Sequence, residues 1–245
     1  MSAPEKALVA GVDGARSGWI AVLRDLAVPG RAEVRTVSHF CEILAFRHAP
    51  SVVAVDIPIG LPDRAGIGGR GPERTVRPLL GERQSSVFSI PSRAAVYCDD
   101  YGNACRIALE TSDPPRKISK QAFNIFPKIR EIDELMTPHL EHCIYEVHPE
   151  VAFWRLNGEK PMSLPKKVKS SANRPGLEER ARLLEGFGFA RTFLDQQLPN
   201  GAGRDDLLDA CVNALIAERI LHGRARPHPE NFERDGRGLR MAIWA

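Results

Sequence analysis

Two aspartates stand where apolar segments of the chain end. Asp13 follows the apolar residues 7–12, and Asp56 follows the apolar residues 52–55. A buried strand that ends on a carboxylate needs a partner for it, because an unpaired buried charge is costly. If the two segments are parallel neighbouring strands, about 4.8 Å apart, both carboxylates lie at one rim of the sheet. Two such charges repel each other unless a cation lies between them, so the pair predicts a cation site.

Further carboxylates lie near the start of a predicted helix late in the chain. Asp206 and Asp209 are i, i+3 neighbours on one helical face, and Asp205 and Asp209 are i, i+4 neighbours. Oxygen ligands without cysteine or histidine favour Mg²⁺ or Mn²⁺ over zinc. The acidic strand ends and the acidic helix start together are the set that one metal site would need.

Each aspartate also has a purely structural interpretation, which the sequence leaves open. Asp13 can bond the backbone of the turn that follows it, and Asp56 can end its strand without consequence. Asp205 and Asp206 fit the N-cap and first turn of a helix. Asp209 lies deeper, among apolar residues, which weakens a capping role for it.

The elements that must position these residues alternate in the order β-β-β-α-β, then a long insert, then β-α and a final helix. Solid apolar runs such as residues 52–55 are typical of strands covered on both faces. A helix is predicted from Ser38 to about residue 49, and the helix predicted near 119–136 is interrupted at Pro127. The predicted strands are 7–13, 17–24, 32–37, 52–56 and 143–147, and the other predicted helices are 98–110, 149–156, 176–186, 189–197 and 205–222.

Composition sets broader bounds on the chain. Its 245 residues, 43% hydrophobic and 27% charged, are ordinary for a globular protein, and the formal net charge of +3 identifies no partner. The five cysteines form no C-x-x-C motif and suit a reducing compartment. No apolar run approaches the ~20 residues of a membrane span, and nothing resembles a signal peptide. We therefore expect a cytoplasmic protein with one domain over residues 1–245, without membrane contact.

The insert, residues 62–140, is the basic part of the chain. Between Arg64 and Arg130 there are twelve Lys or Arg against six Asp or Glu, so the remainder is net acidic. Such a segment can steer a phosphate backbone towards an acidic site, although a solvated loop with structural ion pairs is an equal alternative. Residues 66–71 match G-x-G-x-x-G in spelling, but they neither leave a strand nor open a helix, so a dinucleotide site is not predicted.

Five motifs of the chain resemble domain-of-unknown-function family 429, a family regarded as predicted nucleases of the RNase H-like fold. The motifs are Gly-Val-Asp-Gly-x-x-x-Gly-Trp at 11–19, Val-Asp-Ile-Pro-Ile-Gly-Leu-Pro at 55–62, Leu-Gly-x-Arg-x-Ser-Ser-Val-Phe at 80–88, Glu-Val-His-Pro-Glu at 146–150 and Asp-Asp-Leu-Leu-Asp-Ala at 205–210. The resemblance covers nearly the whole chain. It implies an α/β fold with an RNase H-like mixed five-stranded sheet, three antiparallel strands and then parallel strands, flanked by helices.

The same resemblance implies a set of site residues. Asp13, Asp56 and Asp206 or Asp209 take the metal-ligand roles, and Glu146, at the end of its strand, joins the catalytic set. Such a site hydrolyses phosphodiesters with two divalent ions, Mg²⁺ or Mn²⁺, and needs no side-chain nucleophile. The expected partner is nucleic acid, DNA or RNA. Contacts to its phosphates are expected from Arg83, Ser85, Ser86, Arg93 and Lys166.

Two other functions remain open from the sequence. A phosphotransferase or ATPase of the actin-like, sugar-kinase architecture also carries Asp-Gly in its first hairpin, but the chain lacks a second such hairpin. A non-catalytic RNase H-like scaffold could bind nucleic acid or a phosphorylated ligand, which the intact set of aspartates disfavours.

Overall fold

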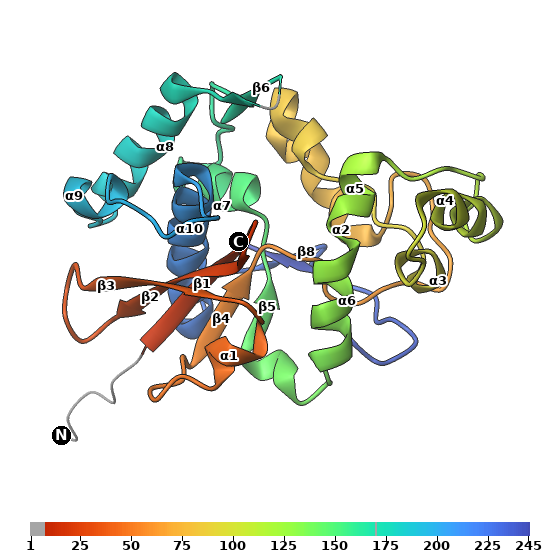
Figure 1. The fold of residues 1–245 in the computed structure, drawn as a ribbon, viewed down its shortest axis with the longest axis horizontal. Coiled ribbons are helices and arrows are strands. Elements are labelled where there is room, and N and C mark those ends of the chain that lie inside the picture. The colour runs from red at the N-terminus through yellow and green to blue at the C-terminus, as the bar shows by residue number, and fades with distance from the viewer. Residues whose placement is uncertain (1–7, 170) are drawn as a thin grey trace.

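A mixed five-stranded sheet forms the centre of the molecule in the computed structural model, which describes residues 8–169 and 171–245 (Figure 1). The strand order is β3-β2-β1-β4-β5. The first three strands are antiparallel, whereas β4 is parallel to both β1 and β5. The predicted mixed α/β sheet is therefore confirmed, while Ala7, the predicted first strand residue, lies outside the described residues. The strands are β1 (Leu8–Ala15), β2 (Gly18–Asp25), β3 (Ala32–Val37), β4 (Val52–Val55) and β5 (Ile144–Glu146).

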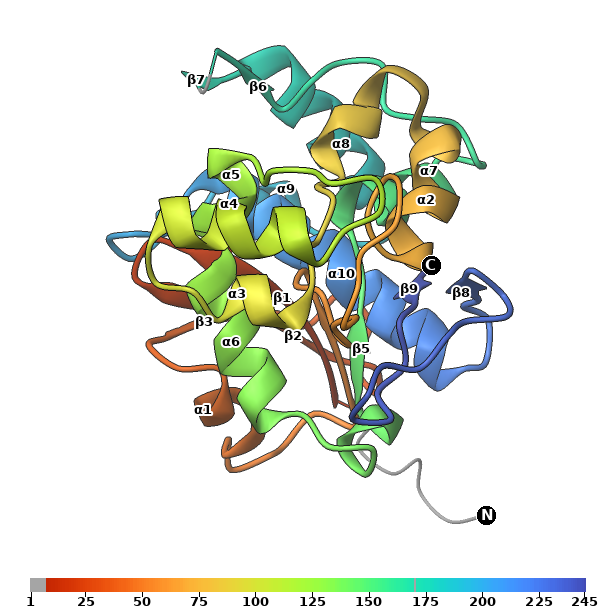
Figure 2. The same ribbon diagram turned by 90° about the vertical axis from the view of Figure 1, so that its right-hand side faces the viewer.

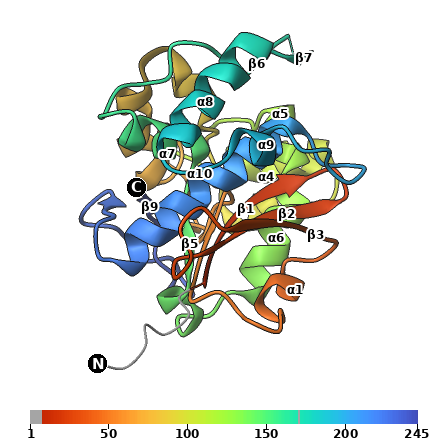
Figure 3. The ribbon, with the colours of Figure 1, turned by 90° about the vertical axis from the view of Figure 1, so that its left-hand side faces the viewer.

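Helices cover both faces of this sheet, and two short hairpins lie outside it. Figure 3 shows α10 crossing one face, with α8 and α9 beyond it, while α1 and α6 lie on the other face. The α-helices are α1 (Cys41–Leu44), α2 (Gly71–Val76), α3 (Arg93–Val96), α4 (Tyr101–Glu110), α5 (Lys120–Asn124), α6 (Phe126–Leu135), α7 (Pro149–Leu156), α8 (Arg174–Gly186), α9 (Arg191–Leu194) and α10 (Arg204–Leu221). Two 3₁₀ segments, Arg77–Ser86 and Leu140–His142, and the strand pairs β6 (Lys167–Val168) with β7 (Ser171–Ala172) and β8 (Pro227–His228) with β9 (Ile243–Trp244) complete the chain.

Strand alternation divides the core into two apolar clusters. Ala10, Val12, Val53 and Val55 face α1 and α6, whereas Val9, Val52 and Ala54 face α7, α8 and α10. Side chains along a strand alternate between faces, so the parity of a residue decides which helices it meets. The same alternation determines which face of the sheet each side chain at a strand end points to.

The insert, residues 62–140 and called the cap from here on, contains α2 to α6 and a long 3₁₀ segment (Figure 2). The predicted interruption near Pro127 is confirmed, because α5 ends at Asn124 and α6 begins at Phe126. The helix predicted from residue 98 begins instead at Tyr101, where Asp100 caps it by accepting a hydrogen bond of 2.8 Å from the Asn103 N–H. α6 is fixed to the sheet through Glu131, which accepts a 3.0 Å hydrogen bond from the Trp19 indole.

One helix is much shorter than predicted. The sequence predicts a helix from Ser38 to about residue 49, but α1 spans only Cys41–Leu44 and has no side-chain cap. Only Phe40 and Ile43 of this segment are fully buried, so a single turn places its apolar residues against the sheet. Pro50 then prevents a helical conformation at the residue before it.

No helix in residues 8–169 and 171–245 is long and apolar enough to cross a membrane.

Candidate metal and phosphodiester site

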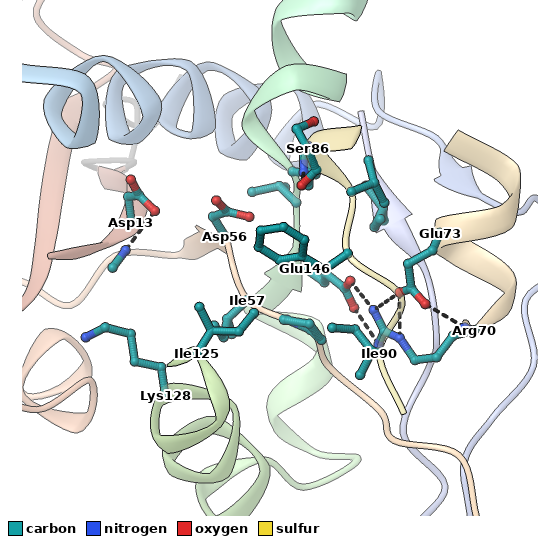
Figure 4. Close-up of a pocket in the computed structure, with 17 residues that line it drawn as sticks. Asp13, Asp56, Ile57, Arg70, Glu73, Ser86, Ile90, Ile125, Lys128 and Glu146 are labelled. Atoms are coloured by element: carbon teal, nitrogen blue, oxygen red, sulfur yellow. Dashed lines mark hydrogen bonds and ion pairs between the residues drawn. The ribbon is translucent and has the colours of Figure 1, made fainter. Parts of the chain in front are cut away.

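Asp13 and Asp56 are neighbours at the carboxyl ends of two parallel strands. Val12 of β1 pairs with Val55 of β4, and the Asp56 N–H donates a 3.0 Å hydrogen bond to the Val12 carbonyl. Alternate residues of a strand point to the same face of the sheet. Asp13 therefore points to the same face as Val9, and Asp56 to the same face as Val52 and Ala54, which is the face covered by α10 (Figure 4). Asp13 is buried and Asp56 is half-buried. The two carboxylates therefore lie together at one rim, as the strand pattern predicts.

Asp209 comes to the same rim from α10. The helix lies unusually close to β1 at Gly11, because a Cβ there would stand 2.0 Å from the Ala214 backbone nitrogen. Asn213 of the same helix donates a 3.0 Å hydrogen bond to the Val12 carbonyl, one residue before Asp13. Asp209, only 2% exposed, is held one turn earlier on this helix. The close approach at Gly11 thus brings the third carboxylate to the first two.

Asp205 and Asp206 have structural partners at the helix start. Asp206, in the first turn of α10, accepts a 2.8 Å hydrogen bond from the N–H of Gly203, the residue before the helix. Asp205 forms a 2.6 Å ion pair with Lys167. Asp206 still contributes to the negative potential at Asp13, where it raises the pKa. The capping interpretation therefore describes the contacts of both residues, and Asp209 is the acid of α10 that meets the strand ends.

Burial and mutual repulsion shift the pKa of all three clustered carboxyls upwards. Burial first, and then the charges of Asp209 and Asp56, raises the pKa of Asp13 well above its usual range. Burial raises the pKa of Asp56 and of Asp209 to about 6 in each case, against the opposing effect of Lys166. The cluster holds more negative charge than its buried surroundings stabilise.

A single ammonium group partly compensates this charge. Lys166, in the segment before β6, forms an ion pair with Asp209 Oδ2. Burial alone would lower the pKa of Lys166, but Asp209 and Asp13 raise it above its usual range. Asp209 Oδ1 is buried and has no hydrogen-bond partner among the described residues. Across residues 8–169 and 171–245, no three His, Cys, Asp or Glu side chains are arranged as a ready-made metal site.

Asp13 also has one local bond that fits its turn interpretation. Its Oδ1 accepts a 2.7 Å hydrogen bond from the Gly14 N–H. This contact uses one oxygen and leaves the other facing the cluster.

A cleft of about 150 Å³ opens between this rim and the cap (Figure 4). Asp13 and Asp56 form one wall, while Ser86, Phe88, Lys128 and His148 contribute to the others. Lys128 lies over the Trp19 ring, 4.5 Å from its centroid, and donates to the Gly18 carbonyl. Burial lowers the pKa of Lys128 and of His148. The cleft therefore combines carboxylates with two basic side chains from the cap, Lys128 and Arg70.

Sequence reasoning missed Lys128, His148 and Glu150 as members of this site. Lys128 lies in a helix far along the chain, and no local signal marks it as facing the Asp13 turn. Glu150 adds negative potential at Asp56 and is held by two hydrogen bonds from the buried Arg180, of 2.6 and 2.8 Å. The Glu-Val-His-Pro-Glu motif, directly after a predicted strand, was the signal that could have identified His148 and Glu150.

Glu146 lies on the other face of the sheet. Glu146 pairs with Val55 and points to the same face of the sheet as Ile144, two residues earlier. It therefore faces the cap rather than α10. Its carboxylate accepts hydrogen bonds of 2.5 and 3.1 Å from Arg70, and a third of 2.7 Å from the Ile59 N–H. Burial raises the pKa of Glu146 to about 7, although Arg70 opposes this shift. The structure thus places Glu146 in a buried ion pair with Arg70: it lines the same cleft as Asp13 and Asp56, but from the other face of the sheet (Figure 4).

We expect Glu146→Gln to lower stability without removing a response to metal. Breaking one side of a buried ion pair costs on the order of 3 kcal/mol, or a fall in Tm of roughly 6 to 12 °C for a chain of this size. Glu82→Gln is the matched control, because Glu82 pairs with Arg83 at the surface. Thermal melting with and without Mn²⁺ measures both quantities. A lost Mn²⁺ response at unchanged stability would instead make Glu146 a metal ligand.

Of the residues expected to contact phosphate, only Ser86 lines the carboxylate cleft. Its hydroxyl donates to the Arg83 carbonyl, and its own carbonyl faces His148 at 3.3 Å. Lys166 is paired with Asp209, and Ser85 faces a second cavity within the cap. Arg93 is bound to Asp133 and Asp235, at 3.0 and 2.6 Å, and Arg83 pairs with Glu82 at 3.4 Å.

The basic residues of the cap are largely used to hold the cap together. Arg70 binds Glu146 and Glu73, while Arg74 and Arg77 donate to the carbonyls of the glycine-rich segment 66–69. An arginine bound to buried carboxylates and carbonyls has a structural role, and the electrostatic potential of its charge that would attract a phosphate backbone is largely cancelled. The structural alternative to a steering role therefore describes the contacts of Arg70, Arg74, Arg77 and Arg93. Of these four, only Arg70 lines the carboxylate cleft.

Comparison with known proteins gives one match. The family model described as protein of unknown function (DUF429) matches residues 11–234. No curated protein and no solved structure matches the chain. The match spans β1 to the segment before β9, and so includes Asp13, Asp56, Asp209 and the whole cap. The chain therefore belongs to the DUF429 family.

Proposed function

We propose that this protein is a metal-dependent phosphodiester hydrolase, a nuclease, that uses Mg²⁺ or Mn²⁺ at Asp13, Asp56 and Asp209. The observation that carries the proposal is the convergence of these three carboxylates at one rim, with raised pKa values and one lysine as compensation. Like charges are brought together in this way at functional sites more often than elsewhere. The RNase H-like sheet suggested by the family resemblance also supports a metal-dependent nuclease.

The donor atoms present fit a divalent cation in their chemistry, and the three side chains would have to move together to hold it. All candidate donors are carboxylate oxygens, which are the ligands that Mg²⁺ and Mn²⁺ prefer. Asp209 Oδ1 is buried without a hydrogen-bond partner among the described residues, so it has an unused acceptor. A divalent cation bound there would stabilise negative charge on a phosphoryl oxygen and lower the pKa of a water molecule.

The chain's own residues have defined tasks in this proposal. Asp13, Asp56 and Asp209 bind the cation, and Lys166 neutralises them in its absence. Lys128 places positive charge across the cleft from Asp13, where it attracts the phosphate.

Cleavage assays on the full chain test the proposal. Bis(p-nitrophenyl) phosphate and a mixed-sequence oligonucleotide are incubated with Mn²⁺, with Mg²⁺ or with a chelator. We expect cleavage only with metal, together with a rise in Tm on adding Mn²⁺. Metal-dependent consumption of ATP without phosphodiester cleavage would favour the phosphotransferase alternative. Oligonucleotide binding without any cleavage would favour the non-catalytic scaffold.

We expect Lys166→Met to lower stability in chelator and to enlarge the Mn²⁺-induced rise in Tm. Removing the ammonium leaves the carboxylates uncompensated, which costs on the order of 3 kcal/mol. A divalent cation then restores this charge balance, and the lysine no longer competes with it. Melting curves with chelator and with Mn²⁺ check both effects. Lys167→Met is the control, because its partner Asp205 lies at the helix start, apart from the cluster; equal responses of the two variants would contradict the assignment.

A further inference from the structure

A second cavity of about 340 Å³ lies within the cap, beside the carboxylate cleft. The two cavities share Val87, Phe88 and Ile90 as a common wall. The volume is at the lower end of the ~300–1,000 Å³ typical of small-ligand sites. A molecule that fills both cavities must therefore pass over this shared wall.

The lining of the cap cavity is opposite in charge to the carboxylate cleft. In residues 8–169 and 171–245, no Asp or Glu lines it, whereas Arg116 and Lys117 do. Both basic side chains are exposed, and neither has an ion pair in the part of the chain that the structure describes. Hydroxyl and amide groups complete the polar lining: Ser85, Ser89, Ser112, Ser119 and Gln121. Ser112 already donates its hydroxyl proton to the Ala108 carbonyl, whereas hydroxyl and amide donors such as those of Ser85, Ser119 and Gln121 suit phosphate oxygens.

The glycine-rich segment forms another side of this cavity. Gly68 and Gly69 have φ angles of +83° and +97°, which favour glycine. Behind them, Arg77 donates to the Gly68 carbonyl and Arg74 to the Gly69 carbonyl, at 2.9 Å for the latter. The Gly68 and Gly69 carbonyls therefore already accept hydrogen bonds, and the guanidinium groups of Arg74 and Arg77 lie against the segment. The segment that failed as a dinucleotide fingerprint is thus a wall of the cavity, held in place by two arginines.

Among the described residues, Phe88 is the one phenylalanine, tyrosine or tryptophan that lines either cavity, and it lies on their shared wall. Its side chain is half-buried and packs against the core cluster beneath it. A ring held in this way presents a surface on which a base can stack, which requires a base that is not paired in a duplex.

We infer that the cap cavity binds a backbone phosphate of single-stranded nucleic acid, with a neighbouring base stacked on Phe88. This inference rests on the proposed function, because the same strand then continues to Asp13 and Asp56. The cations of the cap cavity hold one phosphate while the carboxylate cleft receives another. A substrate of several nucleotides is thereby favoured over a mononucleotide.

Binding of a labelled oligothymidylate, measured by fluorescence anisotropy in chelator, tests the inference without cleavage. We expect the double variant Arg116→Gln/Lys117→Gln to bind about tenfold more weakly or worse. Its plot of log K against log[salt] should flatten by about 0.7, because Arg116 and Lys117 hold one phosphate and each lost phosphate contact contributes about 0.7 for a single strand. The matched control is Arg31→Gln/Arg47→Gln, which removes the same charge beside β3.

Phe88→Leu tests the stacking contact separately. Loss of one stacked base weakens binding by about fivefold or more, while the salt slope stays as in the wild type. Melting curves establish that each variant is folded, and the charge variants lie on exposed side chains that leave the core intact. Equal weakening by the Arg31/Arg47 control would overturn the inference. So would a duplex binding more tightly than the single strand, or thymidine monophosphate competing as well as the oligomer.

The outcomes separate this inference from the proposed function. Metal-dependent cleavage that persists with unchanged binding in the Arg116/Lys117 variant overturns the cap site and leaves the nuclease standing. Binding that depends on Arg116, Lys117 and Phe88 without any cleavage supports the cap site and overturns the nuclease.

Discussion

Asp13→Asn is expected to lower metal-dependent phosphodiester cleavage by about a thousandfold or more. The substitution keeps the size of the side chain and removes one negative charge from the cluster of Asp13, Asp56 and Asp209. Metal stabilisation of the transition state supplies several kcal/mol, and each 1.36 kcal/mol is a factor of ten in rate. The rates are compared in Mn²⁺ well above pH 6, where Asp56 and Asp209, with pKa values of about 6, are ionised.

The same variant should be no less stable than the wild type in chelator. Burial and neighbouring charge raise the pKa of Asp13, so ionising it costs stability in the metal-free fold. The wild type therefore loses stability as pH rises from the ordinary aspartate pKa of the unfolded chain to the raised pKa of the folded protein, and the variant does not. The Tm difference between variant and wild type should grow with increasing pH.

Melting curves with and without Mn²⁺ decide between the two roles of Asp13. A metal ligand predicts a Mn²⁺-induced rise in Tm for the wild type and a much smaller one for the variant. Asp205→Asn is the control, because Asp205 is paired with Lys167. If Mn²⁺ raises the Tm of neither protein, or of both equally, Asp13 does not bind the metal, and its contact with Gly14 describes its whole role.

The sheet and the pairing of the strand ends were predictable, because both follow from short-range patterns. Solid apolar runs predict buried parallel strands, and their ends must meet at one rim. β1 and β4 are indeed neighbours, so Asp13 and Asp56 lie together. The apolar neighbours of Asp209 in the sequence made a helix-capping role weaker for it than for Asp206. Asp209 is the aspartate of α10 that lies against the strand ends.

Features that depend on register or on distant partners were not predictable. Glu146 lies at the end of its strand, much as Asp56 does, but it is paired with Val55, the residue before Asp56. Glu146 therefore points to the same face as Val55, and Asp56 points to the opposite face of the sheet. Arg70 and Arg93 look like free cations in the sequence because their partners lie far along the chain: Glu146 for one, Asp133 and Asp235 for the other. Composition shows a basic segment and cannot show which charges are already paired.

The other large effect is expected at Gly11, whose role was not apparent from the sequence. A Cβ on this residue would stand 2.0 Å from the Ala214 nitrogen and 2.1 Å from the Ala210 carbonyl oxygen. Both are backbone atoms of α10, so the helix itself must move. We expect Gly11→Ala to lower the free energy of unfolding by about 3 kcal/mol or more, the upper part of the range for overpacked cores.

Because α10 also carries Asp209, displacing it should weaken the metal site as well as the fold. Urea unfolding with chelator and with Mn²⁺ measures both: the variant should be less stable in chelator and should gain less from Mn²⁺ than the wild type. Gly186→Ala is the matched control, since Gly186 ends α8 with nothing within 4 Å of an added Cβ. A Gly11→Ala protein as stable as this control would mean that α10 does not lie so close to β1. Gly11 would then not be what brings Asp209 to Asp13 and Asp56.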